Sequence, residues 1–161
     1  MAVIAAGNRN DSSWESQLML TRNPWLIAAA WGSIAASLLH LACIVGGPGW
    51  YRWLGAGEEM AQAAERGLWF PIIVTLGIAT VLAVWALYAF SAAGVIGRVP
   101  LTRTALIAIS GVLLLRALAG LVGPLWRPDL SGSFMLVSSL IVLALGLCFA
   151  IGTWRAWPAL S

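Results

Sequence analysis

Four long runs of apolar residues dominate the pattern of the chain. They extend over residues 25–46, 69–97, 104–123 and 134–154. Each run is close to the roughly 20 residues that an α-helix needs to cross the hydrocarbon layer of a membrane. Membrane-spanning β-strands would alternate with polar residues in shorter segments, and these runs show no such alternation. The pattern therefore predicts an all-α integral membrane protein, built as a four-transmembrane-helix bundle.

Glycine and proline mark the expected ends of these helices. Pro24, directly after Asn23, opens the first run, and the segment Gly-Gly-Pro at 46–48 ends it. Pro71 falls in the first turn of the second run, where its missing N–H costs no hydrogen bond. The third run is expected to stop at Pro124, because proline disfavours the helix interior.

Composition supports a lipid environment. Hydrophobic residues make up 61% of the 161 residues and charged residues only 9%, whereas a soluble domain has roughly a quarter charged. The length fits one domain. The formal net charge of +3 does not indicate nucleic-acid binding, because the arginines are spread singly along the chain.

Arginine placement predicts the orientation. With four spans, both termini and the 98–103 loop share one side, which holds five arginines: Arg9, Arg22, Arg98, Arg103 and Arg155. The other side holds three arginines together with acidic residues: Arg52, Arg66, Arg127, Glu58, Glu59, Glu65 and Asp129. The positive-inside rule then predicts a multi-pass protein of the bacterial inner (plasma) membrane with both termini in the cytoplasm. The expected parts are a polar cytoplasmic tail (1–24), a membrane domain (25–156) and a short cytoplasmic C-terminus (157–161).

The first outer loop, residues 47–67, contains a further predicted helix. The residues from Glu58 to Arg66 are good helix formers flanked by glycines. Glu58 and Glu59 stand at the N-terminal end, where the helix dipole favours negative charge. We expect a short interfacial helix lying on the outer surface.

Two ionisable residues, His40 and Arg116, fall within the predicted spans. Ionisable groups are costly in lipid and tend to mark function. Both residues are expected in the outer half of the membrane, beneath the loop helix. Thr75 in the second span and the pair Ser138-Ser139 in the fourth lie at similar depth.

This convergence predicts a polar pocket that opens to the outer face, formed by His40, Glu58, Glu59, Arg116, Thr75, Ser138 and Ser139. Arg116 needs a counter-charge, which Glu58 or Glu59 would supply, and His40 would titrate beside that ion pair. The structural alternative is that Arg116 snorkels or only holds the loop helix down. Likewise, His40 would then make a simple interhelical hydrogen bond, and the hydroxyls would join helices.

No cofactor and no metal are predicted. One histidine cannot build a zinc site of the usual kind, and the two cysteines, Cys43 and Cys148, form no C-x-x-C pair. The two cysteines should lie near opposite faces of the membrane, too far apart for a disulfide.

Three functions remain open. The first is a non-catalytic subunit or a lipid- and partner-binding module, with membrane lipids, a homo-oligomer or a larger membrane complex as partners. The second is a small oligomeric transporter or channel lined by His40, Arg116 and the glutamates. The third is a lipid-modifying membrane enzyme, with Glu58 or Glu59 as acid/base and Arg116 holding a phosphate. Catalytic residues cannot be assigned from the sequence.

Overall fold

The computed structural model describes residues 22–126 and 132–160. The expectations for the N-terminal tail up to residue 21, and for Arg127 and Asp129, lie outside these residues. In the described part every regular element is helical. The helices are α2 (Pro24–Gly46), α3 (Pro48–Trp53), α4 (Glu58–Glu65), α5 (Trp69–Ala92), α6 (Thr102–Trp126), α7 (Ser133–Ala156) and the 3-10 turn η2 (Trp157–Ala159). Four of them, α2, α5, α6 and α7, are long and apolar enough to span a membrane.

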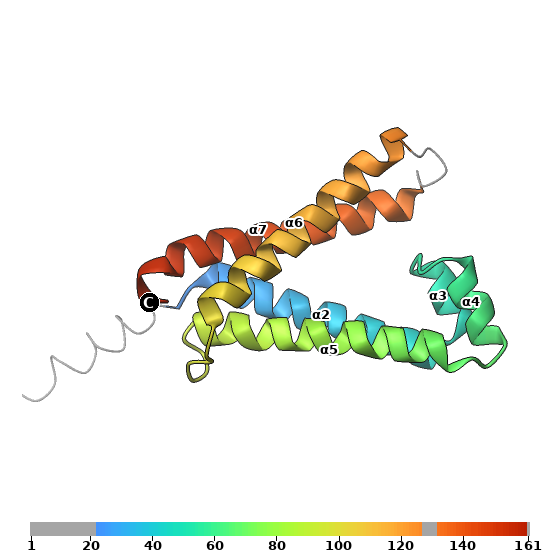
Figure 1. Ribbon diagram of the computed structural model, residues 1–161, viewed down its shortest axis with the longest axis horizontal. Coiled ribbons are helices and arrows are strands. Elements are labelled where there is room, and N and C mark those ends of the chain that lie inside the picture. The colour runs from blue at the N-terminus through green and yellow to red at the C-terminus, as the bar shows by residue number, and fades with distance from the viewer. Residues whose placement is uncertain (1–21, 127–131, 161) are drawn as a thin grey trace, which may run out of the picture.

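The four long helices form two antiparallel hairpins that diverge from a common end (Figure 1). α2 packs along α5, α6 packs along α7, and α2 also contacts α7. We call the end with Asn23, the α5–α6 loop and η2 the closed end, and the end with α3, α4 and the start of α7 the open end. All four helices share one core only at the closed end, so the bundle is splayed rather than packed along its whole length.

The core of the closed end explains why the hairpins meet there. Leu26, Leu106 and Phe149, from α2, α6 and α7, are fully buried, and Ala89 of α5 joins them. Asn23 caps α2 by accepting hydrogen bonds from the first backbone N–H groups of that helix. Its side-chain amide donates to the carbonyl of Gly152 at 2.7 Å, which fastens the start of α2 to the end of α7.

The open end is organised by the two short helices. Tyr51 of α3 is buried and packs with Cys43 of α2 and Ala61 of α4. The predicted loop helix is therefore present as α4, seated with α3 on the end of the α2–α5 hairpin. The loop after α3 also reaches the other hairpin, because Gly55 lies against the ring of Phe134 in the first turn of α7.

Two predicted boundaries are wrong. The second helix ends at Ala92 rather than near residue 97, because Gly94 has φ of +72° and the amides of Gly94 and Val95 bond back to Ser91 and Phe90. This is the Schellman arrangement that ends many helices. The third helix does not stop at Pro124 but continues to Trp126, because a proline in the last turn removes only one hydrogen bond.

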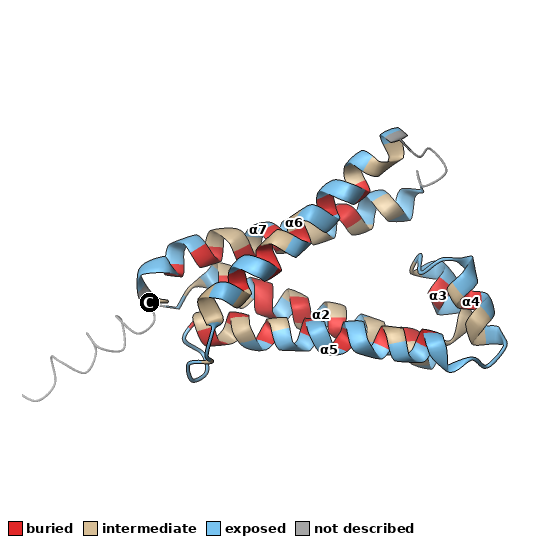
Figure 2. Ribbon diagram, viewed as in Figure 1, coloured by how far each residue is buried: buried red, intermediate tan, exposed pale blue. Residues whose placement is uncertain are grey.

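Burial follows the helix contacts (Figure 2). Buried positions lie between paired helices and at the closed end, whereas the remaining faces are exposed. These exposed faces are apolar, with large side chains such as Val45, Leu115 and Ile141. An apolar surface of this extent is typical of a protein surrounded by lipid.

Candidate functional site

The residues of the expected pocket are divided between the two hairpins. His40 and Thr75 belong to α2 and α5, and Glu58 and Glu59 to α4 seated on them. Arg116, Ser138 and Ser139 belong to α6 and α7. Because the hairpins diverge towards the open end (Figure 1), the structure gives these two groups separate surroundings.

Glu58 is paired with Arg52 and not with Arg116. Arg52, on α3, donates from Nε to Glu58 Oε2 at 2.9 Å and from Nη2 to Glu58 Oε1 at 2.8 Å. Its Nη1 donates to Glu65 Oε1 at 2.7 Å, so one guanidinium holds both ends of α4. Glu59 is exposed and forms no salt bridge within the described ranges. The expected ion pair between the loop helix and α6 is replaced by one inside the loop.

This cluster sets the charge state of its members. The hydrogen bonds to Glu58 and then to Glu65 raise the pKa of Arg52 above its usual range. The hydrogen bonds from Arg52 lower the pKa of the Glu58 carboxyl, despite some desolvation. Gln62 also donates to Glu58, at 3.3 Å. Glu58 is therefore held ionised at neutral pH.

Thr75 serves as a structural contact. It is buried, and its hydroxyl donates to the phenolic oxygen of Tyr51 at 3.2 Å. This hydrogen bond joins α5 to α3. One helical turn further along α5, Ser37 of α2 donates to the carbonyl of Ala79 at 2.8 Å. The hydroxyls of Thr75 and Ser37 therefore join helices.

His40 is half-buried, and its Nδ1 lies 2.7 Å from the carbonyl oxygen of Ala36, one turn earlier in α2. Because a carbonyl oxygen accepts, Nδ1 is the donor of this hydrogen bond. The bond is within one helix and not between helices. None of the acidic residues that the structure describes lies within salt-bridge distance of His40.

Arg116 is exposed on α6 and has no carboxylate within salt-bridge distance among the residues described. Arg116 lies about 21 Å along the helix axis from Thr102, the first residue of α6, because each residue of a helix adds about 1.5 Å. The guanidinium extends towards the open end: Nη2 lies 4.0 Å from Met135 Sδ, and Nη1 lies beside Gly120, one turn further along α6. This direction is that of a snorkelling side chain.

Ser139 lies next to this arginine. A Cβ on Gly120 would overlap the hydroxyl of Ser139 and lie 2.8 Å from Arg116 Nη1, so the three groups share one small region of the α6–α7 crossing. Ser139 is fully buried and its hydroxyl has no hydrogen-bond partner in the described part of the chain. Ser138 instead donates to the carbonyl of Met135 at 3.1 Å. Arg116 and Ser139 are the two expected pocket residues that the structure brings together on this hairpin.

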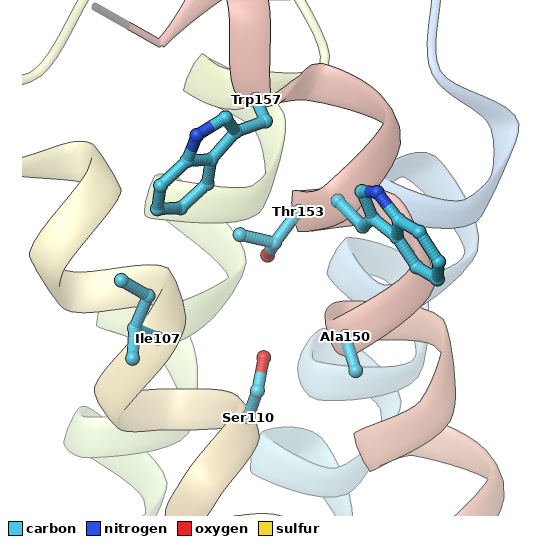
Figure 3. A pocket seen from close by; sticks show the side chains of 6 residues that line it. Ile107, Ser110, Ala150, Thr153 and Trp157 are labelled. Carbon is cyan, nitrogen blue, oxygen red and sulfur yellow. The ribbon is translucent and has the colours of Figure 1, made fainter.

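A second feature, which the sequence did not indicate, lies at the closed end. A groove of about 450 Å³ runs between α6 and α7 (Figure 3). Its lining consists of Ile107, Ser110, Ala150, Thr153, Trp154 and Trp157. The i, i+3 spacing of Trp154 and Trp157 is the signal that could have indicated a shared surface.

No group of three or more His, Cys, Asp or Glu side chains within residues 22–126 and 132–160 could hold a metal ion. Cys43 and Cys148 are both free. Comparison with models of protein families, with curated proteins and with solved structures finds no match for this chain. By the length and composition of its helices, the chain is a multi-pass helical membrane protein.

Proposed function

We propose that the protein is a non-catalytic membrane module that binds an anionic group at Arg116, supplied by a lipid headgroup or by an acidic side chain of a partner chain. The observation behind this proposal is the charge of Arg116, which has no carboxylate within salt-bridge distance in residues 22–126 and 132–160. An arginine inside a spanning helix is costly in lipid and is normally neutralised. The glutamate expected to neutralise it is bound by Arg52 instead.

The surroundings of Arg116 favour binding over a purely structural role. A structural arginine would satisfy its donors within the chain, but among the described residues the acceptor that Arg116 meets is a thioether at 4.0 Å, which is a weak acceptor. A phosphate or carboxylate at the exposed guanidinium would accept hydrogen bonds from its N–H groups.

The same geometry disfavours the catalytic alternative. A general acid needs a pKa near the working pH, whereas the pKa of Glu58 is lowered by Arg52. Glu58 also lies on the hairpin opposite Arg116. An enzyme that used both residues would have to separate the Arg52–Glu58 pair first.

A transporter is disfavoured because the polar side chains that would line its path already form hydrogen bonds with nearby groups of the protein. His40 and Ser138 bond to carbonyls of their own helices, and Thr75 bonds to Tyr51. These local hydrogen bonds leave no row of free donors along a path in the described part of the chain. An oligomer axis remains the arrangement in which His40 would line such a path.

The proposal includes an orientation. Every charged residue described at the closed end is an arginine, namely Arg22, Arg98, Arg103 and Arg155. The described acids, Glu58, Glu59 and Glu65, are all in α4 at the open end. By the positive-inside rule the closed end would face the cytoplasm of a bacterial inner membrane, and Arg116 would bind in the outer leaflet.

Native mass spectrometry of the protein released from nanodiscs tests the proposal, because it counts bound lipids and associated chains together. Wild-type protein should retain one more anionic lipid or partner chain than Arg116→Leu does. Arg66→Leu is the matched control, since Arg66 is an exposed arginine at the end of α4. Equal retention by wild type and Arg116→Leu would overturn the proposal, and so would a wild type that retains neither.

A further inference from the structure

We propose that the groove at the closed end binds one acyl chain of an anionic phospholipid, whose phosphate is held by Arg103. This site is separate from Arg116, because it lies at the closed end of the α6–α7 hairpin, whereas Arg116 lies past the middle of α6 and extends towards the open end.

Small side chains create the groove. α6 and α7 are in close contact at Gly146, where a Cβ would lie 3.1 Å from Leu113 Cβ. Towards the closed end the facing positions are Ser110 and Ala150, which are too small to fill the space between the helices. Trp157 lines the groove on the side of the helix ends, away from Ser110, as Figure 3 shows. The result is a slot that begins at the helix ends and extends into the part of the fold expected in hydrocarbon.

The lining accepts an apolar chain and offers little to a polar solute. Ile107 and Ala150 present methyl groups to it. The two hydroxyls are occupied, since Ser110 donates to the carbonyl of Leu106 at 2.7 Å and Thr153 to that of Phe149 at 2.7 Å. Each hydroxyl has one hydrogen, so neither has a donor left for a ligand. Burial of methylene groups is the main favourable term such a surface provides.

The rim of the groove is cationic. The guanidinium of Arg103 stacks on the Trp157 ring, with Cζ 3.6 Å from the ring centroid. Arg103 is one turn before Ile107 and two turns before Ser110, so the three residues share one face of α6. A stacked guanidinium keeps its in-plane N–H groups available, and these suit the two oxygens of a phosphate. No hydrogen bond or salt bridge joins Arg103 to a protein acceptor within the described ranges.

Charge complementarity selects an anionic lipid over a zwitterionic one. Arg98 and Arg155 lie at the same end as Arg103, and the residues described there include no carboxylate that would compensate them. A cluster of arginines at the membrane surface attracts anionic headgroups. Trp154 and Trp157 suit the same level, because indole rings prefer the interface between headgroups and chains. One phospholipid would therefore meet the arginine with its phosphate and the groove with its chain.

Photolabelling in nanodiscs provides a test with site resolution. The probe is a phosphatidylglycerol with a diazirine in its acyl chain, and peptide mass spectrometry maps the labelled residues. We expect labelling within 107–110 and 150–157 that excess unlabelled phosphatidylglycerol suppresses and phosphatidylcholine does not. Equal suppression by both lipids would overturn the proposal, because it would describe ordinary lipid contact. An absence of labelling in these segments would overturn it as well.

Variants separate the two parts of the site. Arg103→Gln should reduce labelling of the groove about tenfold, since a charged hydrogen bond to a phosphate is lost. Arg103→Lys should restore only part of it, because lysine keeps the charge but not the planar pair of N–H groups. Ala150→Phe should block the groove, whereas Ile141→Phe, on the exposed face of the same helix, should not. Unchanged labelling in Arg103→Gln would overturn the assignment of Arg103, even if Ala150→Phe fails to fold. The Arg116→Leu variant should label the groove normally, so the two proposals can fail independently.

Discussion

The guanidinium of Arg52 binds the Glu58 carboxylate through two parallel hydrogen bonds of 2.9 and 2.8 Å. This bidentate geometry is the strongest that an arginine and a carboxylate form. It joins α3 to α4 within a single loop, and its formation leaves Arg116 without the partner that the sequence suggested. The organisation of the open end and the isolation of the intramembrane charge thus have one common cause.

Replacement of Arg116 tests whether its charge stabilises the fold. In delipidated detergent, Arg116→Leu should leave the free energy of unfolding unchanged or raise it, by up to about 2 kcal/mol, because the cost of placing arginine in an apolar region is removed. Thermal unfolding in detergent measures the difference. Arg52→Leu is the contrasting variant and should release α4 from α3. If Arg116→Leu lowers stability instead, the charge is a structural tie.

Acidification should weaken the attachment of α4. The folded-state pKa of Glu58 is lowered from its ordinary value of 4.5, so the unfolded state binds the proton more readily and stability rises with pH in this range. The contribution is complete above pH 4.5 and is lost as the pH falls below that value through the lowered pKa. Carboxyl NMR titration of Glu58 measures this shift directly. In Arg52→Gln the pKa should return towards its ordinary value, and an unchanged titration would contradict the assigned cause.

The contact between Gly55 and Phe134 should restrain the angle between the hairpins. Gly55→Ala combines a φ of +65° with overlap against the Phe134 ring, and a side chain at such a φ costs roughly 1–2 kcal/mol. We expect lower stability and a wider distance distribution between spin labels on α4 and the start of α7. Gly49→Ala is the control, because a Cβ at Gly49 would meet nothing within 4 Å. Equal distributions in the two variants would show that the contact does not set the angle.

The sequence predicted the helices well because their causes are local. A run of about 20 apolar residues has few other folds open to it in lipid, and the start of α2 at Asn23-Pro24 follows from capping chemistry. The error in the predicted end of the second helix also has a local cause. The apolar run extends to residue 97, but Gly94, three residues earlier, provides the left-handed residue that ends the second helix.

The arrangement of the hairpins could not be predicted in the same way. The long helices are apolar on all sides, so no polar face indicates which side meets a neighbour. The pairing of Arg52 with Glu58 was missed for another reason. Arg116 is the most costly charge in the sequence and therefore suggests a glutamate partner, whereas Glu58 bonds to Arg52, the arginine nearest to it in the chain. Local pairing within a loop loses less chain entropy than pairing across the fold.

The crossing of α2 and α7 at the closed end should be the point of the fold most sensitive to a single methyl group. A Cβ on Gly152 would lie 2.7 Å from Leu26 Cγ and 3.1 Å from the Leu26 backbone nitrogen. Leu26 is fully buried, and the backbone atom cannot move aside without displacing α2. Gly152→Ala should therefore destabilise the protein by about 1–3 kcal/mol through overpacking.

The same substitution at Gly77 of α5 provides the comparison. A Cβ there would meet nothing within 4 Å, and alanine favours the helix over glycine by up to about 1 kcal/mol. Gly77→Ala should therefore unfold at an equal or higher temperature than wild type. Asn23→Ala should resemble Gly152→Ala, because it removes both the cap of α2 and the hydrogen bond to the Gly152 carbonyl. If Gly152→Ala and Gly77→Ala have the same unfolding temperature, the hairpins are not held together at this crossing, and the closed end must depend on the α5–α6 contact instead.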